Sequence, residues 1–170
     1  MALSMYQFSV PAFVRGLEAL AGMLAKGAAH AQDHGIDPSE LVQARLAPDM
    51  MTLAAQVQRA SDTSKLALER LSGVPAPKMA DEEATFAEIQ DRVARTIAYL
   101  RQIDAAALDG AEARTISLKF GAEFAPTFTG DAYLSSFALP NFYFHLTTAY
   151  AILRHKGVKL SKPDFLNLQA

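Results

Sequence analysis

The sequence predicts a mainly α-helical protein, a four-helix bundle with a small β-hairpin or extended insertion between the third and fourth helices. Four long segments place apolar residues three and four positions apart, which is the period of an amphipathic helix. One segment after residue 114 alternates apolar and polar residues, which is the period of a strand. With 170 residues, 51% of them hydrophobic and 20% charged, the chain has the size and composition of one globular domain, expected over residues 1–170.

The first long helix is expected to begin near Ser9, with Ser9 as its N-cap and Pro11 in its first turn. Gly35 and Pro38 are expected to end it, and a short helix is expected within residues 39–46. The apolar stripe of this first helix consists of Val10, Phe13, Leu17, Leu20, Leu24 and Ala28.

The second and third long helices are expected over residues 49–71 and 85–103. Gly73 and the prolines that follow it end the second helix. The acidic residues at 81–83 are interpreted as a solvated start of the third helix, where the helix dipole favours negative charge. The two apolar stripes are formed by Leu53, Val57, Ala60, Ser64, Leu68 and Leu71, and by Phe86, Ile89, Val93, Ile97 and Leu100.

A β-hairpin or extended excursion is expected over residues 114–134, with a turn at Gly130-Asp131. The fourth long helix is expected to open at Pro140 and to run to about His155. Apolar residues cover nearly its whole circumference, so burial on most sides is expected. The tail over residues 159–170 is expected to be irregular and packed by Phe165.

Composition excludes several classes of protein. The net charge is -2, so nothing supports nucleic-acid binding, and the lack of cysteine excludes a disulfide scaffold, a cysteine-ligated metal and a cysteine nucleophile. The N-terminus lacks the pattern of a signal peptide, and the apolar stretch at 139–153 is shorter than the roughly 20 residues that cross a bilayer. A cytoplasmic protein without membrane contact is therefore expected.

The common catalytic motifs, among them GxGxxG, the P-loop, HExxH and GxSxG, do not occur in the sequence. His30 and His34 lie four residues apart at the end of the first helix. A basic cap on the helix C-terminus is the interpretation that we favour for this pair.

The strongest candidate site combines Gln56 on the second helix with Asn141 and His145 on the fourth. Asn141 and His145 are one turn apart on one face, and Thr148 continues their stripe. Gln56 lies near the apolar stripe of its helix, whereas Asp62 is expected to point to solvent. Three converging polar side chains in a bundle core can hold a metal, a water or a small polar ligand, and the alternative is a hydrogen-bonded core network.

Three segments carry a resemblance to a known family: SMYQFSVPAFVRGLEAL, LAPDMMTLAAQVQRASDTSKLALERLSG and LPNFYFHLTTAYAILRHKGVKLSKPDFL. Across nearly its whole length the chain resembles the DinB/YfiT-like superfamily of helical bundles, and more closely a bacterial subfamily of unknown function. The resemblance implies a four-helix bundle that associates in pairs. It also implies a divalent metal held by three histidines, one on the second helix and two, four residues apart, on the fourth. Members with known roles are mostly metal-dependent transferases or isomerases that use low-molecular-weight thiols.

This sequence departs from the family pattern at the metal site. Gln56 and Asn141 occupy two of the positions where the resemblance implies histidines, and only His145 matches. One imidazole and two amides form a poor transition-metal site, so any divalent metal is expected to be weakly held, with His145 as its candidate ligand.

Three functional hypotheses follow. The first is a non-catalytic or weakly metal-binding module that binds a small polar ligand through Gln56, Asn141 and His145. The alternative is a metal-dependent thiol transferase or isomerase of the DinB/YfiT type. The third is a bundle whose polar residues form a core network. A homodimer is expected from the resemblance and from the apolar fourth helix.

Overall fold

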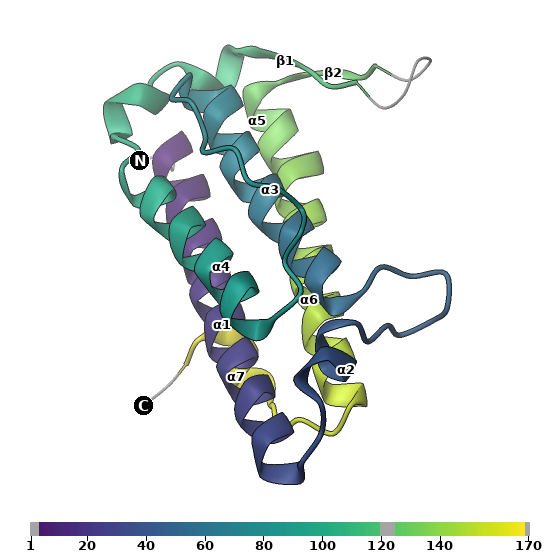
Figure 1. Cartoon of the computed structure of the whole chain (residues 1–170). Coiled ribbons are helices and arrows are strands. Elements are labelled where there is room, and N and C mark those ends of the chain that lie inside the picture. Colours follow the sequence, from purple (N-terminus) through teal and green to yellow (C-terminus); the bar gives the residue numbers. More distant parts are fainter. Residues whose placement is uncertain (1–3, 120–124, 169–170) are drawn as a thin grey trace.

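Four long helices form an elongated bundle in the computed structural model, which describes residues 4–119 and 125–168 (Figure 1). Helix α1 contacts α4 and α6, and α3 contacts the same two helices, so the order around the bundle is α1, α4, α3, α6. The mainly helical fold with a small hairpin before the last long helix is confirmed. The four long helices are α1 (Met5–His34), α3 (Leu53–Ser72), α4 (Phe86–Arg101) and α6 (Leu139–His155).

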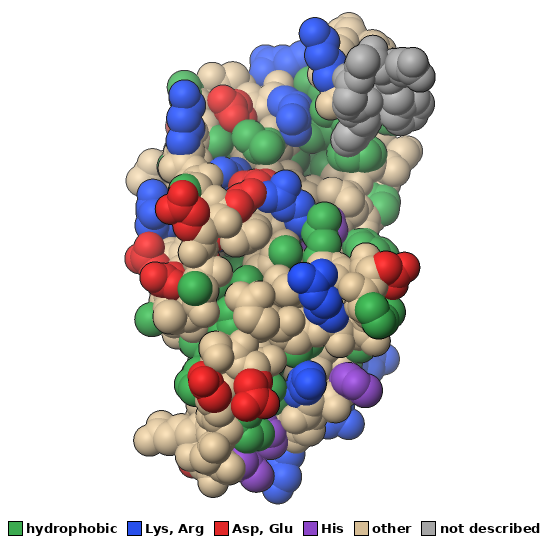
Figure 2. Space-filling view, turned by 45° about the vertical axis from the view of Figure 1, so that its right-hand side comes forward, with side chains coloured by type: hydrophobic (Ala, Val, Ile, Leu, Met, Phe, Trp, Pro, Cys, Tyr) green, Lys and Arg blue, Asp and Glu red, His purple; other side chains and the backbone are tan. Residues whose placement is uncertain are grey.

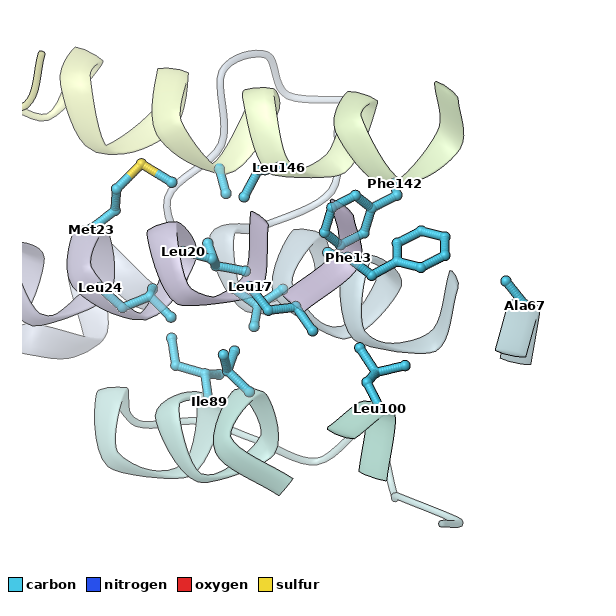
Figure 3. Close-up of a cluster of buried hydrophobic side chains, with 14 of the residues drawn as sticks. Phe13, Leu17, Leu20, Met23, Leu24, Ala67, Ile89, Leu100, Phe142 and Leu146 are labelled. Carbon is cyan, nitrogen blue, oxygen red and sulfur yellow. The ribbon is translucent and has the colours of Figure 1, made fainter. Parts of the chain in front are cut away.

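The core lies where the apolar stripes of the four helices meet (Figure 3). Phe13 of α1 packs edge-on against Phe142 of α6, with 5.1 Å between the ring centroids. Leu17 of α1 and Ile89 of α4 are fully buried, as the helical periodicity predicts. By length and hydropathy α1 is also a candidate membrane span, but half of its most apolar window is buried inside the bundle, as in a core helix.

The N-cap of helix α1 is Ser4, five residues before the predicted Ser9, so the helix begins at Met5. The Ser4 hydroxyl accepts a hydrogen bond from the Gln7 backbone, and the Gln7 side chain accepts one from the Ser4 backbone. This reciprocal capping box satisfies two backbone donors. Ser9, the predicted N-cap, is buried inside the helix, and Pro11 lies in the second turn.

The chain takes a long crossover between α3 and α4. Residues 73–85, which we call the strap, return along the length of α3, so that α3 and α4 run in the same direction (Figure 1). Tyr99 donates from its hydroxyl to the Val74 carbonyl at 2.8 Å, and Lys65 Nζ donates to the Pro77 carbonyl at 3.1 Å. The bundle therefore has a long connection between α3 and α4 as well as the predicted insertion between α4 and α6.

The hairpin was predicted over too long a segment. Strands β1 (Thr115–Ser117) and β2 (Thr127–Thr129) pair antiparallel, with Ile116 opposite Phe128. The predicted alternation also covers residues 120–124, which lie outside the described residues. From Gly130 onward the chain is helical: α5 (Gly130–Tyr133) and five π-helical residues, η3 (Leu134–Ala138), lead directly into α6.

Helix α6 was predicted to open at Pro140, but the helical path begins ten residues earlier. Pro140 lacks the N–H that would bond to a carbonyl of the preceding turn, and the wider π-helical turn lies directly before it. Gly130 fits the start of this path because a Cβ there would lie 1.8 Å from the Ala111 carbonyl oxygen. The close approach joins α5 to η2 (Ala111–Ala113), which follows η1 (Ala105–Leu108) after α4.

The short helices α2 and α7 differ in how well they were predicted. Helix α2 (Pro38–Val42) occupies the front of the predicted segment 39–46. The tail was predicted to be irregular, but α7 (Lys162–Leu166) forms there, because Ser161 and Asp164 build a capping box. Phe165 packs against Tyr150 of α6 as expected, with 5.8 Å between the ring centroids.

Candidate functional site

Three side-chain hydrogen bonds join α3 to the α5–α6 path, and we call this line the α3–α6 seam. They join Gln56 to His145, Thr63 to Asn141, and Arg70 to Tyr133. The three α3 residues are spaced by seven positions, or about two turns, so they lie on one face of the helix. This face of α3 therefore carries polar groups along the whole length of its packing against α6.

His145 and Gln56 form the most buried pair of the seam. Their exposed fractions are 8% and 2%, and 2.7 Å separates His145 Nδ1 from Gln56 Oε1. Since an amide oxygen only accepts, Nδ1 carries the hydrogen and donates it. Burial lowers the pKa of His145, and the positive charge of Arg59 lowers it further. His145 is therefore held as a neutral imidazole whose Nε2 is left as an acceptor.

Asn141 takes a different partner from the one expected. Its Nδ2 donates to Thr63 Oγ1 at 2.8 Å, one turn of α6 away from His145. The structure thus brings Gln56 and His145 together and places Asn141 in a neighbouring pair of the same seam. Thr148, the next polar residue along the stripe, donates to the Phe144 carbonyl of its own helix.

The residues present do not fit a three-histidine metal site. His145 Nδ1 is bonded to Gln56, and the amide of Asn141 is bonded to Thr63. Within residues 4–119 and 125–168, no group of three or more His, Cys, Asp or Glu side chains is arranged to hold a metal ion. Nε2 of His145 is the one strong transition-metal donor that Gln56, Asn141 and His145 offer together.

A cleft of about 250 Å³ opens beside the Thr63–Asn141 pair, between α3 and the α5–α6 path. Charged, polar and apolar side chains all line this cleft. Several Lys and Arg side chains lie beside hydrophobic ones in the upper half of the face shown in Figure 2. The cleft is lined by Arg59, Asp62, Thr63, Leu66, Arg70, Leu118, Lys119, Tyr133, Phe137 and Asn141.

Where α3 faces α4 and the strap, it carries a network of charges, some of them buried, that sequence reasoning missed. The guanidinium of Arg92 is 1% exposed and contacts Asp62 at 2.8 Å, Asp81 at 3.0 Å and Glu83 at 2.8 Å. Asp62, predicted to face solvent, also contacts Lys65 at 2.9 Å. We call this set, completed by Arg59, the Arg92 network.

The acidic residues at 81–83 are therefore more than a solvated helix start. Burial alone would raise the pKa of Glu83, but hydrogen bonds from Arg92 and Gln58 outweigh it and lower that pKa. A sequence signal existed: Arg92 lies between Ile89 and Thr96 on the inward face of its helix. A cation on an apolar stripe indicates a buried ionic partner, because an unpaired buried charge is too costly.

The outer face of α6 is less buried than its composition predicts. Tyr143 is 39% exposed and Phe144 57% exposed, and Leu46 lies beside them at 39%. We call these residues, with Thr147 and Ala151, the α6 patch.

At the far end of α1, His34 Nδ1 lies 2.9 Å from the His30 carbonyl oxygen, in keeping with the predicted helix cap.

Comparison with known proteins agrees with the fold and with the resemblance in sequence. Residues 5–166 match the model of a domain of unknown function, DUF1993. The chain is also similar to the crystal structure of a DinB family member protein from Shewanella denitrificans, with 38% sequence identity and a TM-score of 0.87. That match covers 95% of this chain and 91% of the other. No curated protein matches significantly. The chain therefore belongs to the DUF1993 family and has the DinB-like helical fold.

Proposed function

We propose that this protein is a non-catalytic module that binds a small polar ligand in the cleft between α3 and the α5–α6 path. The cleft beside the Thr63–Asn141 pair carries the proposal. Its volume of about 250 Å³ lies just below the roughly 300–1,000 Å³ of pockets that hold drug-sized molecules. A metabolite of few non-hydrogen atoms fits such a space.

The Thr63–Asn141 pair can recognise both a donor and an acceptor on the ligand. Asn141 uses its Nδ2 hydrogen toward Thr63, and Thr63 uses its oxygen to accept it. For Asn141 Oδ1 and the Thr63 hydroxyl hydrogen, the described residues provide no side-chain partner. Asn141 Oδ1 is thus able to accept one hydrogen bond from a ligand, and Thr63 is able to donate one.

His145 has a supporting role in this proposal. Its bond to Gln56 holds α6 against α3 one turn below the Thr63–Asn141 pair. The pair therefore fixes the position of Asn141 without closing the cleft.

A thermal-shift screen tests the proposal, because a ligand that binds only the folded state raises the unfolding temperature. We expect members of a panel of single-ring amides, carboxylates and amines to stabilise the wild type, and to stabilise Thr63→Val and Asn141→Ala less. Thr115→Val, on the exposed side of β1, is the matched control and should respond like the wild type. A panel that stabilises all four proteins equally, or none of them, contradicts the proposal.

The alternative is a metal-dependent thiol transferase or isomerase of the DinB type, which the relation to a DinB family member favours. Under our proposal, untagged protein binds Zn²⁺ weakly and loses it to a chelator. Gln56→His combined with Asn141→His should raise the affinity for Zn²⁺ strongly, since imidazoles replace both amides. Wild-type protein that purifies with one tightly held transition metal per chain would favour the alternative.

We also propose that a second copy of the chain covers the α6 patch. Of the seven large hydrophobic residues that are exposed among residues 4–119 and 125–168, three gather there: Leu46, Tyr143 and Phe144. Light scattering should give twice the 18.4 kDa of one chain at micromolar concentration. Phe144→Ser should shift the protein to the monomer, and Phe8→Ser, which removes an exposed phenylalanine elsewhere, should not. A wild-type monomer would exclude the dimer.

A further inference from the structure

We infer that the ligand of the cleft is a small anion with an apolar body, and that Arg70 and Lys119 hold its negative charge. The inference rests on the proposed function, since it names the class of ligand for the same cleft. It follows from the distribution of charge along the cleft, which is balanced at one end and positive at the other.

The end of the cleft near Arg59 is electrically balanced. Arg59 contacts Asp62 at 3.3 Å and also contacts Asp81. The Arg92 network as a whole contains three cations and three carboxylates in mutual contact. A ligand charge of either sign would have to compete with existing ion pairs there. The network comprises Arg59, Lys65 and Arg92 on one side, and Asp62, Asp81 and Glu83 on the other.

The end near Arg70 carries positive charge that no carboxylate of the described residues matches. Arg70 donates to the Tyr133 hydroxyl at 2.9 Å, and its guanidinium carbon lies 5.9 Å from the centre of the Tyr133 ring. For Arg70 and Lys119, the part of the chain that the structure describes provides no carboxylate within 4.0 Å. Both side chains line the cleft, so an anion in it would meet two cations.

Tyr133 does not supply the missing negative charge. It is 1% exposed, and burial raises the pKa of its hydroxyl, although Arg70 opposes this rise. A neutral phenol therefore orients the guanidinium without neutralising it. A guanidinium has five N–H donors in a planar fork, which suits a carboxylate that accepts two hydrogen bonds side by side.

The remaining lining residues indicate the rest of the ligand. Leu66, Leu118 and Phe137 contribute apolar surface beside the two cations. A fully hydrated inorganic anion would gain nothing from that surface, whereas an aromatic or branched carboxylate would bury its body against it. The class of ligand is therefore a monocarboxylate with a compact apolar body.

Benzoate and benzamide form a matched pair of probes, because they share size and shape and differ in charge. We expect isothermal titration to show that the wild type binds benzoate about tenfold more tightly than benzamide, with the difference shrinking at high salt. Arg70→Gln and Lys119→Gln should each reduce this preference, because each weakens the binding of benzoate more than that of benzamide. Arg15→Gln, on the exposed face of α1, removes the same charge elsewhere and should keep the preference.

Arg70→Lys, which keeps the charge and loses the fork, should show an intermediate preference provided that circular dichroism shows it folded. Equal affinity for benzoate and benzamide, or an undiminished preference in both Arg70→Gln and Lys119→Gln, would overturn the inference and leave the proposed function standing. If neither probe binds although a member of the thermal-shift panel does, the inference fails alone. If nothing in the panel binds either, the proposed function fails with it.

Discussion

Helix α3 carries two polar regions that differ in how their charges are matched. Toward α4 and the strap, Asp62 belongs to a network in which buried and partly exposed cations and carboxylates balance. Toward α6, the adjacent residue Thr63 belongs to a seam of mostly neutral hydrogen bonds beside a cleft. In the Arg92 network each charge has a partner of opposite sign, whereas in the seam Arg70 contacts no carboxylate among the described residues. Ligand binding is therefore better supported where charge is unmatched than where charge is most abundant.

The Arg92 network acts as a structural device. Arg92 donates to the Ala80 carbonyl at 3.0 Å in addition to its three ion pairs, and so it fixes the strap to the groove between α3 and α4. Buried ion pairs add little net stability compared with apolar packing, but removal of one partner leaves the others uncompensated. The network thus specifies where the strap lies more than it adds to the stability of the fold.

Removal of Arg92 should have the largest effect of any substitution in the two regions. Arg92→Met removes the cation that contacts the largely buried Glu83, and it leaves Asp62 with only Arg59 and Lys65. We expect a loss of about 3 kcal/mol in the free energy of unfolding, measured by urea denaturation. Arg95→Met, on the exposed face of the same helix, should change that free energy by less than about 0.5 kcal/mol. Similar losses for both variants would mean that the network does not hold the strap.

The next largest effect is expected in the seam. His145→Ala leaves Oε1 of the Gln56 side chain, which is 2% exposed, without the donor that it accepts from. The free energy of unfolding should fall by about 1–3 kcal/mol, which is the cost of an unsatisfied buried polar group. His30→Ala, at the far end of α1, serves as the control and should have little effect. An unchanged unfolding curve for His145→Ala would show that the pair is not formed.

A smaller effect is expected for the pair that borders the cleft. Asn141→Ala removes a hydrogen bond to Thr63, but both side chains are only partly buried, so water can replace the lost partner. We expect a loss of about 1 kcal/mol in the free energy of unfolding. In this variant the rise in unfolding temperature that a cleft ligand causes should be largely lost, whereas the free protein should lose only a small part of its stability. If instead the free protein is strongly destabilised and the ligand-induced rise is kept, Asn141 has a structural role and is not part of a binding site.

The smallest expected change is in the pH dependence of the free energy of unfolding. It reports on His145 in the seam and not on the Arg92 network. Because the pKa of His145 is lower in the folded protein than the ordinary 6.5, the unfolded chain binds a proton at higher pH than the folded one. The free energy of unfolding should therefore fall as the pH drops from about 6.5 toward the folded-state pKa, with no contribution from this group at higher pH. Urea denaturation at a series of pH values measures this slope. His145→Gln should remove it, and His155→Gln should preserve it.

The periodicity of apolar residues was enough to locate the long helices, because burial of one stripe per helix is a local property of the sequence. Periodicity did not locate helix ends where two nearby residues could each serve as the N-cap. Ser4 and Ser9 both have the chemistry of an N-cap, and the reciprocal bond with Gln7 decides between them. The helical path from Gly130 was missed because the alternation before it was extended too far.

For the candidate site, the sequence by itself determined that Gln56 and His145 lie on facing sides of two helices, since helical spacing fixes the face on which each residue lies. It did not determine which polar groups meet. Asn141 bonds to Thr63 and Asp62 turns toward Arg92 because the order of helices around the bundle, and the course of the strap, place those partners within reach. Periodicity gives the direction of a side chain relative to its own helix axis. Its partner depends on the neighbouring helix and on the axial offset between the two, and only the tertiary structure decided these.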